Sequence, residues 1–408
     1  MRMQIFSQFR HRPLPALAVL LFAVVISFAL CGLQRSNDAE RESYEASYQA
    51  TTVPFSVTNL YGEEITEGRA IRGWIADAFI GMGVSEPYLA EYVKNLKMEL
   101  TRSINGEYAG YTLAGIPSAV ATSLLDRARG GKVTWFDGYD ESILERTFEE
   151  GDLFCVIPST LYETLEPGTK ELKVEFFDYN RGERLLDGSY RYKSVHRTLV
   201  IAGSYASLKQ EYTIYCPYGV VRRVAGELDF STDVMSISGV LRDNYRLEEF
   251  REVAANWFAV PNANGEKTPW NRWGYEYYLY ALDIDDTVLQ RVTRNYQISL
   301  FINKMSSMLV LAFCTAAGFF IGFLMVRARK REIGLMRTLG GSNFHIYLGF
   351  VAEQLLCVGA GIALGGALMK FNAPKQLALF ALVYFVGLSA ALVVFLHKNL
   401  LSSMKEDE

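Results

Sequence analysis

The chain has 408 residues, half of them apolar, and carries a net charge of −4 at pH 7. Its length exceeds the usual size of one domain, and its small negative charge argues against nucleic acid as a partner. Basic residues gather beside long apolar segments, while most acidic residues lie in a long central region. These totals predict a membrane protein with one large water-facing part.

Long apolar segments without charges, or nearly so, predict membrane-spanning helices. They are residues 14–33, 305–326, 346–369 and 377–396. Each reaches the about 20 residues that a helix needs to cross a hydrocarbon core of roughly 30 Å. The third contains Glu353, and a buried charge of this kind is a candidate site unless it is paired. We favour an ion pair between Glu353 and the basic residues that precede its span.

Lysines and arginines beside the spans predict that both termini are cytoplasmic. With this orientation, residues 1–13, 327–345 and 397–408 hold ten basic residues, whereas the short outer loop 370–376 holds two. Residues 34–304 are then extracytoplasmic. A cleaved signal peptide is the alternative for the first segment, but its apolar run is about twice a typical h-region, so we expect a retained anchor.

Residues 34–304 are numerous enough to form a core of their own. The polar stretch after the first span has no Pro or Gly, and residues 285–304 show a helical repeat behind Asp286, a candidate N-cap. Both stretches therefore predict stalk helices. Between them, mixed periodicity predicts an α+β domain of two lobes, with a strand-rich lobe inserted at about 172–221.

The elements expected in this domain follow from short apolar runs and helical spacings. Strands are predicted at residues 51–60, 132–136, 151–157, 172–179, 197–205, 210–218, 233–241 and 275–284. Helices are predicted at residues 88–104, 140–148, 158–165 and 246–258.

Catalytic chemistry has little support in the sequence. The four histidines are scattered without metal-ligand spacing, and no nucleophile elbow occurs. The phosphate-binding pattern G-x-x-x-x-G-K-[ST] is also missing. We therefore expect no enzyme activity and no cofactor in this chain, so that any energy from nucleotide must come from another protein.

Two further sets of residues leave alternatives open. Trp257, Trp270 and Trp273 lie in an aromatic-rich stretch that could contact an amphiphilic ligand, although an aromatic core is the interpretation we favour. Cys155 and Cys216 both fall in the outer region, where an oxidising compartment would permit a disulfide. The sequence does not indicate whether these two cysteines are close in space.

The inner connection 327–345 begins with a basic cluster and continues with an amphipathic stretch. Its first basic residues can anchor the span at anionic headgroups. After them, Ile333, Met336 and Leu339 recur at helical spacing. A short helix with this pattern could insert its apolar edge into a groove on a soluble partner, and Gly340 permits a sharp reversal into the next span.

The stretch "RKREIGLMRTLGGSNFHIYLGFVAEQLLCVGAGIALGGAL" resembles the signature of the FtsX-like, MacB-type ABC transporter permeases. That signature has a basic cluster, Glu-Ile, an apolar pair, a basic residue and Leu-Gly, then a span with a Glu and several Gly. The order of one span, a large outer domain and three spans is also similar to this family. "GDLFCVIPSTLYETLEPG" is reminiscent of the MacB extracytoplasmic core domain, but the chain has no fused ATPase.

The resemblance implies a mechanism in the cytoplasmic membrane. The family's coupling helix, which sits on the ATPase subunit, matches Glu332, Ile333, Leu335, Met336, Arg337, Leu339 and Gly340, and the family's intramembrane acid matches Glu353. The partners implied are a separate nucleotide-binding subunit that binds ATP and Mg, a second permease chain, identical or not, and the lipid bilayer. Closure of the ATPases would move the outer domains by mechanotransmission.

The expected function is efflux or extraction of an amphiphilic or peptide substrate. A transmembrane signalling subunit that activates a cell-wall hydrolase or senses peptides, without transport, is the alternative. A membrane-anchored receptor without any ATPase is a third hypothesis, and it would not require an apolar edge in the inner loop.

Overall fold

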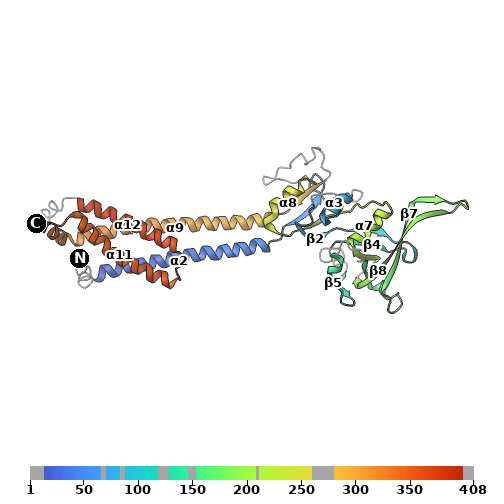
Figure 1. Ribbon diagram of the computed structural model, residues 1–408, viewed down its shortest axis with the longest axis horizontal. Helices are drawn as coiled ribbons and strands as arrows, with labels where there is room; N and C mark the ends of the chain where they lie inside the picture. Colours follow the sequence, from blue (N-terminus) through green and yellow to red (C-terminus); the bar gives the residue numbers. More distant parts are fainter. Residues whose placement is uncertain are drawn as a thin grey trace. The chain divides into compact units, whose positions relative to one another are not determined.

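The computed structural model describes residues 13–65, 70–82, 88–117, 128–145, 153–207, 211–259 and 280–397 (Figure 1). Its contacts divide the chain into two compact units. We call Met1–Tyr48 with Arg291–Glu408 the helical unit and Gln49–Gln290 the sheet unit, and each is described by itself.

The helical unit is built from long apolar helices. In the described part of the chain, four helices are long and apolar enough to cross a membrane. They are α2 (Pro13–Ala50), α9 (Thr287–Ala328), α11 (Asn343–Leu368) and α12 (Pro374–His397), and the short helix α10 (Lys330–Thr338) follows α9. A sheet-rich region separates the first two, so the layout fits a multi-pass membrane protein.

Both predicted stalks are continuous with their spans, because α2 runs on to Ala50 and α9 begins at Thr287. Polar and aromatic contacts join the two helices. The rings of Tyr44 and Tyr296 stack with centroids 4.2 Å apart. Glu40 accepts hydrogen bonds from Ser299 Oγ at 2.7 Å and from Asn303 Nδ2 at 3.0 Å. These directional contacts set the register between α2 and α9 more specifically than apolar packing alone.

Glycines allow the apolar helices to approach closely. A Cβ on Gly318 of α9 would lie 2.4 Å from the carbonyl oxygen of Tyr384 on α12. A Cβ on Gly361 of α11 would lie 2.8 Å from the carbonyl oxygen of Leu20 on α2. Since real Cβ atoms do not come so close to backbone, these small residues serve helix packing within this chain.

The first sheet of the sheet unit is antiparallel, with the order β11-β1-β10-β2. Its strands are β1 (Pro54–Thr58), β2 (Val93–Lys97), β10 (Ser238–Leu241) and β11 (Ala281–Ile284). Helices α3 (Gly73–Ile80) and α8 (Leu247–Ala254) pack on one side of it through Phe55, whose ring lies 5.5 Å from that of Phe79 and 5.6 Å from that of Phe250.

The second sheet is mixed and, among the described residues, has seven strands in the order β3-β4-β9-β6-β8-β5, with β7 paired to β8. The strands are β3 (Leu100–Ser103), β4 (Thr112–Ile116), β5 (Ala128–Trp135), β6 (Phe154–Pro158), β7 (Glu171–Arg184), β8 (Tyr190–Ser207) and β9 (Thr213–Pro217). Helix α7 (Tyr218–Glu227) packs on β3, β4 and β9. The strand-rich lobe therefore begins at Leu100 and is wider than the predicted 172–221.

The helix predicted at residues 88–104 is wrong, because this stretch forms β2 and β3. The pairing of β2 with β10 contains a register shift, and Asn95 adopts a left-handed backbone with φ 50°. A bulge adds a residue to the strand, so Val93 and Leu96 are both buried although they are three positions apart. That spacing imitates a helical repeat.

A buried ion pair joins the helices of the two sheets. Asp77 on α3 is buried, and Arg222 on α7 donates to it through Nε at 3.0 Å and Nη2 at 2.9 Å.

At the start of α9, Asp286 accepts from Arg251 Nη2 at 2.6 Å and from Gln290 Nε2 at 2.9 Å. The N–H of Thr287 donates to Asp285 Oδ1 at 3.2 Å. Asp286, the predicted N-cap, directly precedes α9, and its carbonyl accepts from Gln290 N at 2.9 Å.

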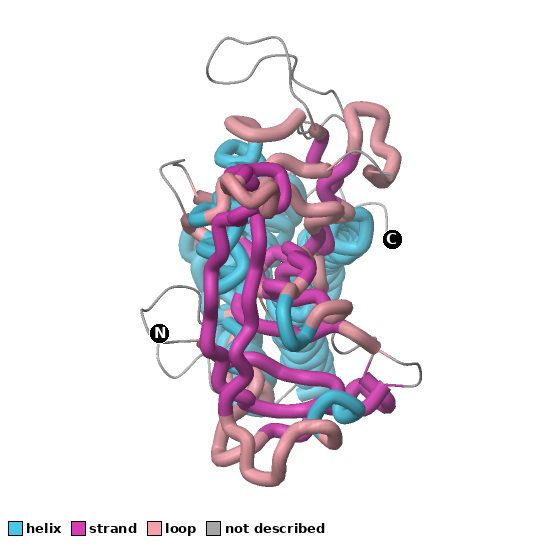
Figure 2. Tube along the Cα trace, turned by 90° about the vertical axis from the view of Figure 1, so that its right-hand side faces the viewer, coloured by secondary structure: helices cyan, strands magenta, loops and turns pink. Residues whose placement is uncertain are grey.

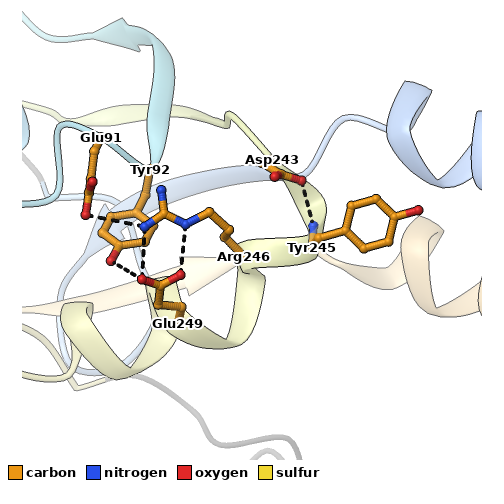
Figure 3. A network of polar contacts seen from close by, with 6 residues as sticks. All are labelled: Glu91, Tyr92, Asp243, Tyr245, Arg246 and Glu249. Atoms are coloured by element: carbon orange, nitrogen blue, oxygen red, sulfur yellow. Dashed lines mark hydrogen bonds and ion pairs between the residues drawn. The ribbon is translucent and has the colours of Figure 1, made fainter.

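A polar network ties α8 to the beginning of β2 (Figure 3). Arg246 donates to both carboxylate oxygens of Glu249 at 2.8 and 2.9 Å, and the Tyr92 hydroxyl donates to the same group at 2.8 Å. Arg246 also lies 4.3 Å from the centre of the Tyr92 ring. The hydrogen bonds from Arg246 and then Tyr92 lower the pKa of Glu249 to about 2, while burial and the bond to Glu249 raise the pKa of Tyr92 to about 12.

Replacing Glu249 with Gln should remove an acid-sensitive part of the stability of the sheet unit. The folded state holds Glu249 ionised below its ordinary pKa of 4.5, so its contribution is present above pH 4.5 and is lost as the pH falls towards 2. Tryptophan-monitored unfolding of the full-length protein in detergent should show Glu249→Gln less stable than wild type at pH 6, with the gap closing by pH 2. Glu252→Gln on the same helix is the control, and a gap that does not change with pH would contradict the assignment.

Candidate functional site

The junction between α9 and α10 is the centre of the candidate site. Arg329 lies between the two helices, and its backbone (φ −115°, ψ 22°) departs from helical geometry. Its N–H donates to the carbonyl of Met325 at 3.1 Å, and its own carbonyl accepts from the N–H of Ile333 at 3.0 Å. One residue thus changes the direction of the chain while its backbone hydrogen bonds continue on both sides.

The side chain of Arg329 forms a two-pronged ion pair with Glu353 of α11. Nη1 and Nη2 each lie 2.8 Å from one carboxylate oxygen. The two side chains are 13% and 9% exposed, and the guanidinium also lies 5.4 Å from the centre of the Phe350 ring. Such paired geometry compensates the cost of removing both charges from water. The predicted ion pair of Glu353 with the preceding basic residues is confirmed.

A second buried polar group lies beside this pair. Gln354 accepts a hydrogen bond from the Tyr384 hydroxyl at 3.0 Å, and its amide nitrogen lies 3.1 Å from the sulfur of Met325. Glu353 and Gln354 are consecutive residues of α11. Glu353 binds Arg329 at the junction, and Gln354 contacts Met325 at the end of α9 and Tyr384 on α12. The junction is fixed on three helices at once.

Helix α10 presents an apolar surface that differs in part from the predicted edge. Ile333 is buried and packs in the core of the long helices. Leu335 is 64% exposed and Leu339 79%, and Met336 is also exposed. We call Leu335, Met336 and Leu339 the α10 apolar surface. Ile333 was predicted to belong to this edge but anchors α10 from the opposite side, because helical spacing alone does not indicate which side faces the neighbouring helices.

The remaining residues of the predicted coupling segment border this surface. Glu332 is exposed, and Arg337 is partly buried in the last turn of α10. Gly340 has φ +87°, which a side chain tolerates poorly. This residue allows the chain to reverse before α11, where the N–H of His345 donates to the hydroxyl of the N-cap residue Ser342.

The predicted aromatic set is described in part. Trp257, just after α8, contacts Trp74 of α3 with ring centroids 5.6 Å apart. Trp270 and Trp273 lie outside the described residues. Trp74 was not singled out from the sequence, because its short helix α3 carries apolar residues on most positions and shows no clear period.

Cys155 and Cys216 are brought together by the second sheet. Strands β6 and β9 pair antiparallel at Val156 and Tyr215, which places the two cysteines opposite each other. Both are free and fully buried. Burial raises the pKa of both thiols, and for Cys216 the neighbouring Cys155 adds to the effect. The candidate disulfide is therefore not formed in the structure, although its partners are neighbours.

Within the described ranges, no group of three His, Cys, Asp or Glu side chains is arranged to hold a metal ion. Comparison of the sequence with models of known protein families and with curated proteins finds no match.

Removing one partner of the junction ion pair should destabilise the helical unit strongly. Glu353→Leu leaves the guanidinium of Arg329 buried and uncompensated, which costs about 3–5 kcal/mol. The double variant Arg329→Met/Glu353→Leu should recover most of this loss, as measured by thermal unfolding of the purified protein in detergent. Equal and additive losses from the two single variants would argue that the groups do not interact.

The two sheet cysteines should behave as protected thiols. A maleimide should leave Cys155 and Cys216 unmodified in the folded protein, because they are buried and little thiolate forms below their raised pKa. After unfolding without reductant, mass spectrometry should find both labelled. If they react only after reduction, the two sulfurs are bonded in the isolated protein.

Proposed function

We propose that this chain is the permease subunit of an ABC-type transporter. It couples ATP hydrolysis by a separate nucleotide-binding protein to motion of its sheet unit, for efflux or extraction of an amphiphilic or peptide substrate. The proposal is supported by the resemblance of residues 329–368 to the FtsX-like permeases, by the long apolar helices, and by the large sheet-rich region between α2 and α9.

The observation that carries the proposal is the α10 apolar surface held by a rigid support. Exposed Leu335, Met336 and Leu339 offer an apolar edge that a groove on a soluble partner could bury. On the other side, Ile333 and the Arg329–Glu353 ion pair hold α10 to the long helices. A coupling element needs both properties, because a loosely attached helix would absorb a displacement and not transmit it.

The displacement of α10 would be carried along one uninterrupted helix. From Arg329 the chain runs through α9, which is one helix from Thr287 to Ala328. Helix α2 accompanies α9 through the Tyr44–Tyr296 stack and the hydrogen bonds of Glu40. A push on α10 would therefore reach the stalk as a movement of two joined helices.

The same proposal includes the orientation of the chain in the membrane. Arg327 at the end of α9 and Arg331 in the first turn of α10 are exposed, and they could bind anionic headgroups of the inner leaflet. The excess of basic residues supports a cytoplasmic position of α10 and both termini. The partner ATPase is then reached by α10, and ATP and Mg are bound by that partner.

A charge on the α10 apolar surface should abolish association with the ATPase. Met336→Asp or Leu339→Asp would place a carboxylate in an apolar groove, and we expect capture to fall at least about tenfold, which corresponds to 1.4 kcal/mol. The measurement is a pull-down of the tagged full-length chain from its native membranes, with mass spectrometry for a protein carrying the G-x-x-x-x-G-K-[ST] pattern.

Two controls accompany this experiment. Met336→Leu keeps the surface apolar and should retain the partner, and Leu60→Asp, at an exposed turn of the sheet unit, should do so as well. Thermal unfolding should be unchanged in all variants. If the wild-type chain captures no such ATPase, or Met336→Asp captures it equally well, the proposal fails.

A further inference from the structure

The strands β7 and β8 continue beyond the sheet as a two-stranded ribbon. Their pairing runs from Glu171 opposite Val200 to Arg184 opposite Tyr190, with an irregularity after Asp178. The turn is closed by hydrogen bonds from Leu185 N to Ser189 O at 2.8 Å and from Gly188 N to Leu185 O at 3.0 Å. Figures 1 and 2 show the two long strands side by side, with their turn projecting from the sheet.

The apex of this ribbon is apolar. Leu186 has a relative exposure of 110%, and Leu185 beside it is also exposed. Asp187 is the acidic residue of the turn, and its Oδ1 accepts hydrogen bonds from Ser189 N at 2.9 Å and Ser189 Oγ at 2.6 Å. Its carboxylate is therefore engaged in the turn, and two leucine side chains occupy the apex.

Aromatic rings follow behind the apex on one face of the ribbon. Tyr190 stacks on Tyr192 at 6.1 Å, Tyr192 contacts Tyr179 at 5.1 Å, and Tyr179 contacts Phe177 at 5.9 Å. A Cβ on Gly182 would lie 2.7 Å from the ring of Tyr192, so the glycine makes room for this row. Tyr179 and Tyr190 are both more than half exposed.

Basic side chains accompany the tyrosines. Arg184 and Arg191 are exposed near the end of the ribbon, and Lys193, further back, donates to the carbonyl of Glu227. The acidic residues of residues 178–193 are Asp178, which lies opposite Lys193 in the register, Glu183, which lies opposite Arg191, and Asp187, which is held in the turn. With Arg181 counted, residues 178–193 hold four basic and three acidic residues, a net charge of +1.

We propose that the end of the β7–β8 ribbon contacts an anionic lipid surface. Leu185 and Leu186 enter the acyl boundary, the tyrosines lie at headgroup depth, and Arg184 and Arg191 bind lipid phosphates. The order along the ribbon carries this inference, because leucine, then tyrosine and arginine, is the order of depth at which these side chains are stable in a membrane interface. The proposal is independent of the ATPase partner.

A fluorescent probe at the apex tests this contact in the full-length protein. All five native cysteines are buried, so Leu186→Cys can be labelled selectively with an environment-sensitive fluorophore after reconstitution into vesicles of phosphatidylcholine and phosphatidylglycerol. Lipids with spin-labelled acyl chains are placed either in the host vesicles or in added protein-free vesicles. We expect the emission of the fluorophore to shift to the blue, and the spin-labelled lipids to quench it, in at least one of these two arrangements.

Matched variants separate the lipid contact from general exposure. Tyr61, which is 88% exposed in another turn of the sheet unit, gives the control Tyr61→Cys, whose probe should not be quenched. Arg184→Gln and Arg191→Gln should each weaken the contact about fivefold, and vesicles of phosphatidylcholine alone should weaken it further. Arg184→Lys should retain it.

Three results would overturn the proposal. The first is the absence of lipid quenching at Leu186→Cys in both arrangements. The second is equal quenching at Tyr61→Cys. The third is a probe shielded from an aqueous quencher only when another protein copurifies, which would assign the apex to a protein partner.

Discussion

The ion pair between Arg329 and Glu353 is the interaction on which the helical unit depends most. Two charges removed from water are costly, and they are tolerated here because Nη1 and Nη2 of the guanidinium each donate to one oxygen of the carboxylate. Arg329, one member of this pair, is also the single residue between α9 and α10. A single interaction therefore sets the angle of the short helix and fixes the end of a helix that runs to Thr287.

The sheet unit uses the same principle at its own joints. Asp77 and Arg222 connect α3 with α7, and Arg251 and Asp286 connect α8 with the start of α9. Each pair has one buried or nearly buried acid, so that loss of its partner would leave a charge without compensation. Apolar packing supplies most of the driving force for folding, whereas these directional pairs determine which elements lie together.

The exposed apolar residues of the two units differ in their physical meaning. On the long helices they are expected, because lipid replaces water around a membrane span. On α10 and at the end of the β7–β8 ribbon they lie outside those spans, at Met336 and Leu339 in one case and at Leu186 in the other. Water does not favour such groups, so both places are candidates for contact with a partner.

The sequence by itself determined the long apolar helices, the stalks and most strands, because an apolar run or a short period is local information. It also indicated the ion pair of Glu353 without its partner. Tertiary structure alone decided that Arg329 is this partner, that Ile333 points inward, and that residues 88–104 are bulged strand. Helical spacing leaves open which side meets a neighbour, and strand pairing joins residues as distant as Cys155 and Cys216. Such choices depend on contacts between elements, so local pattern does not encode them.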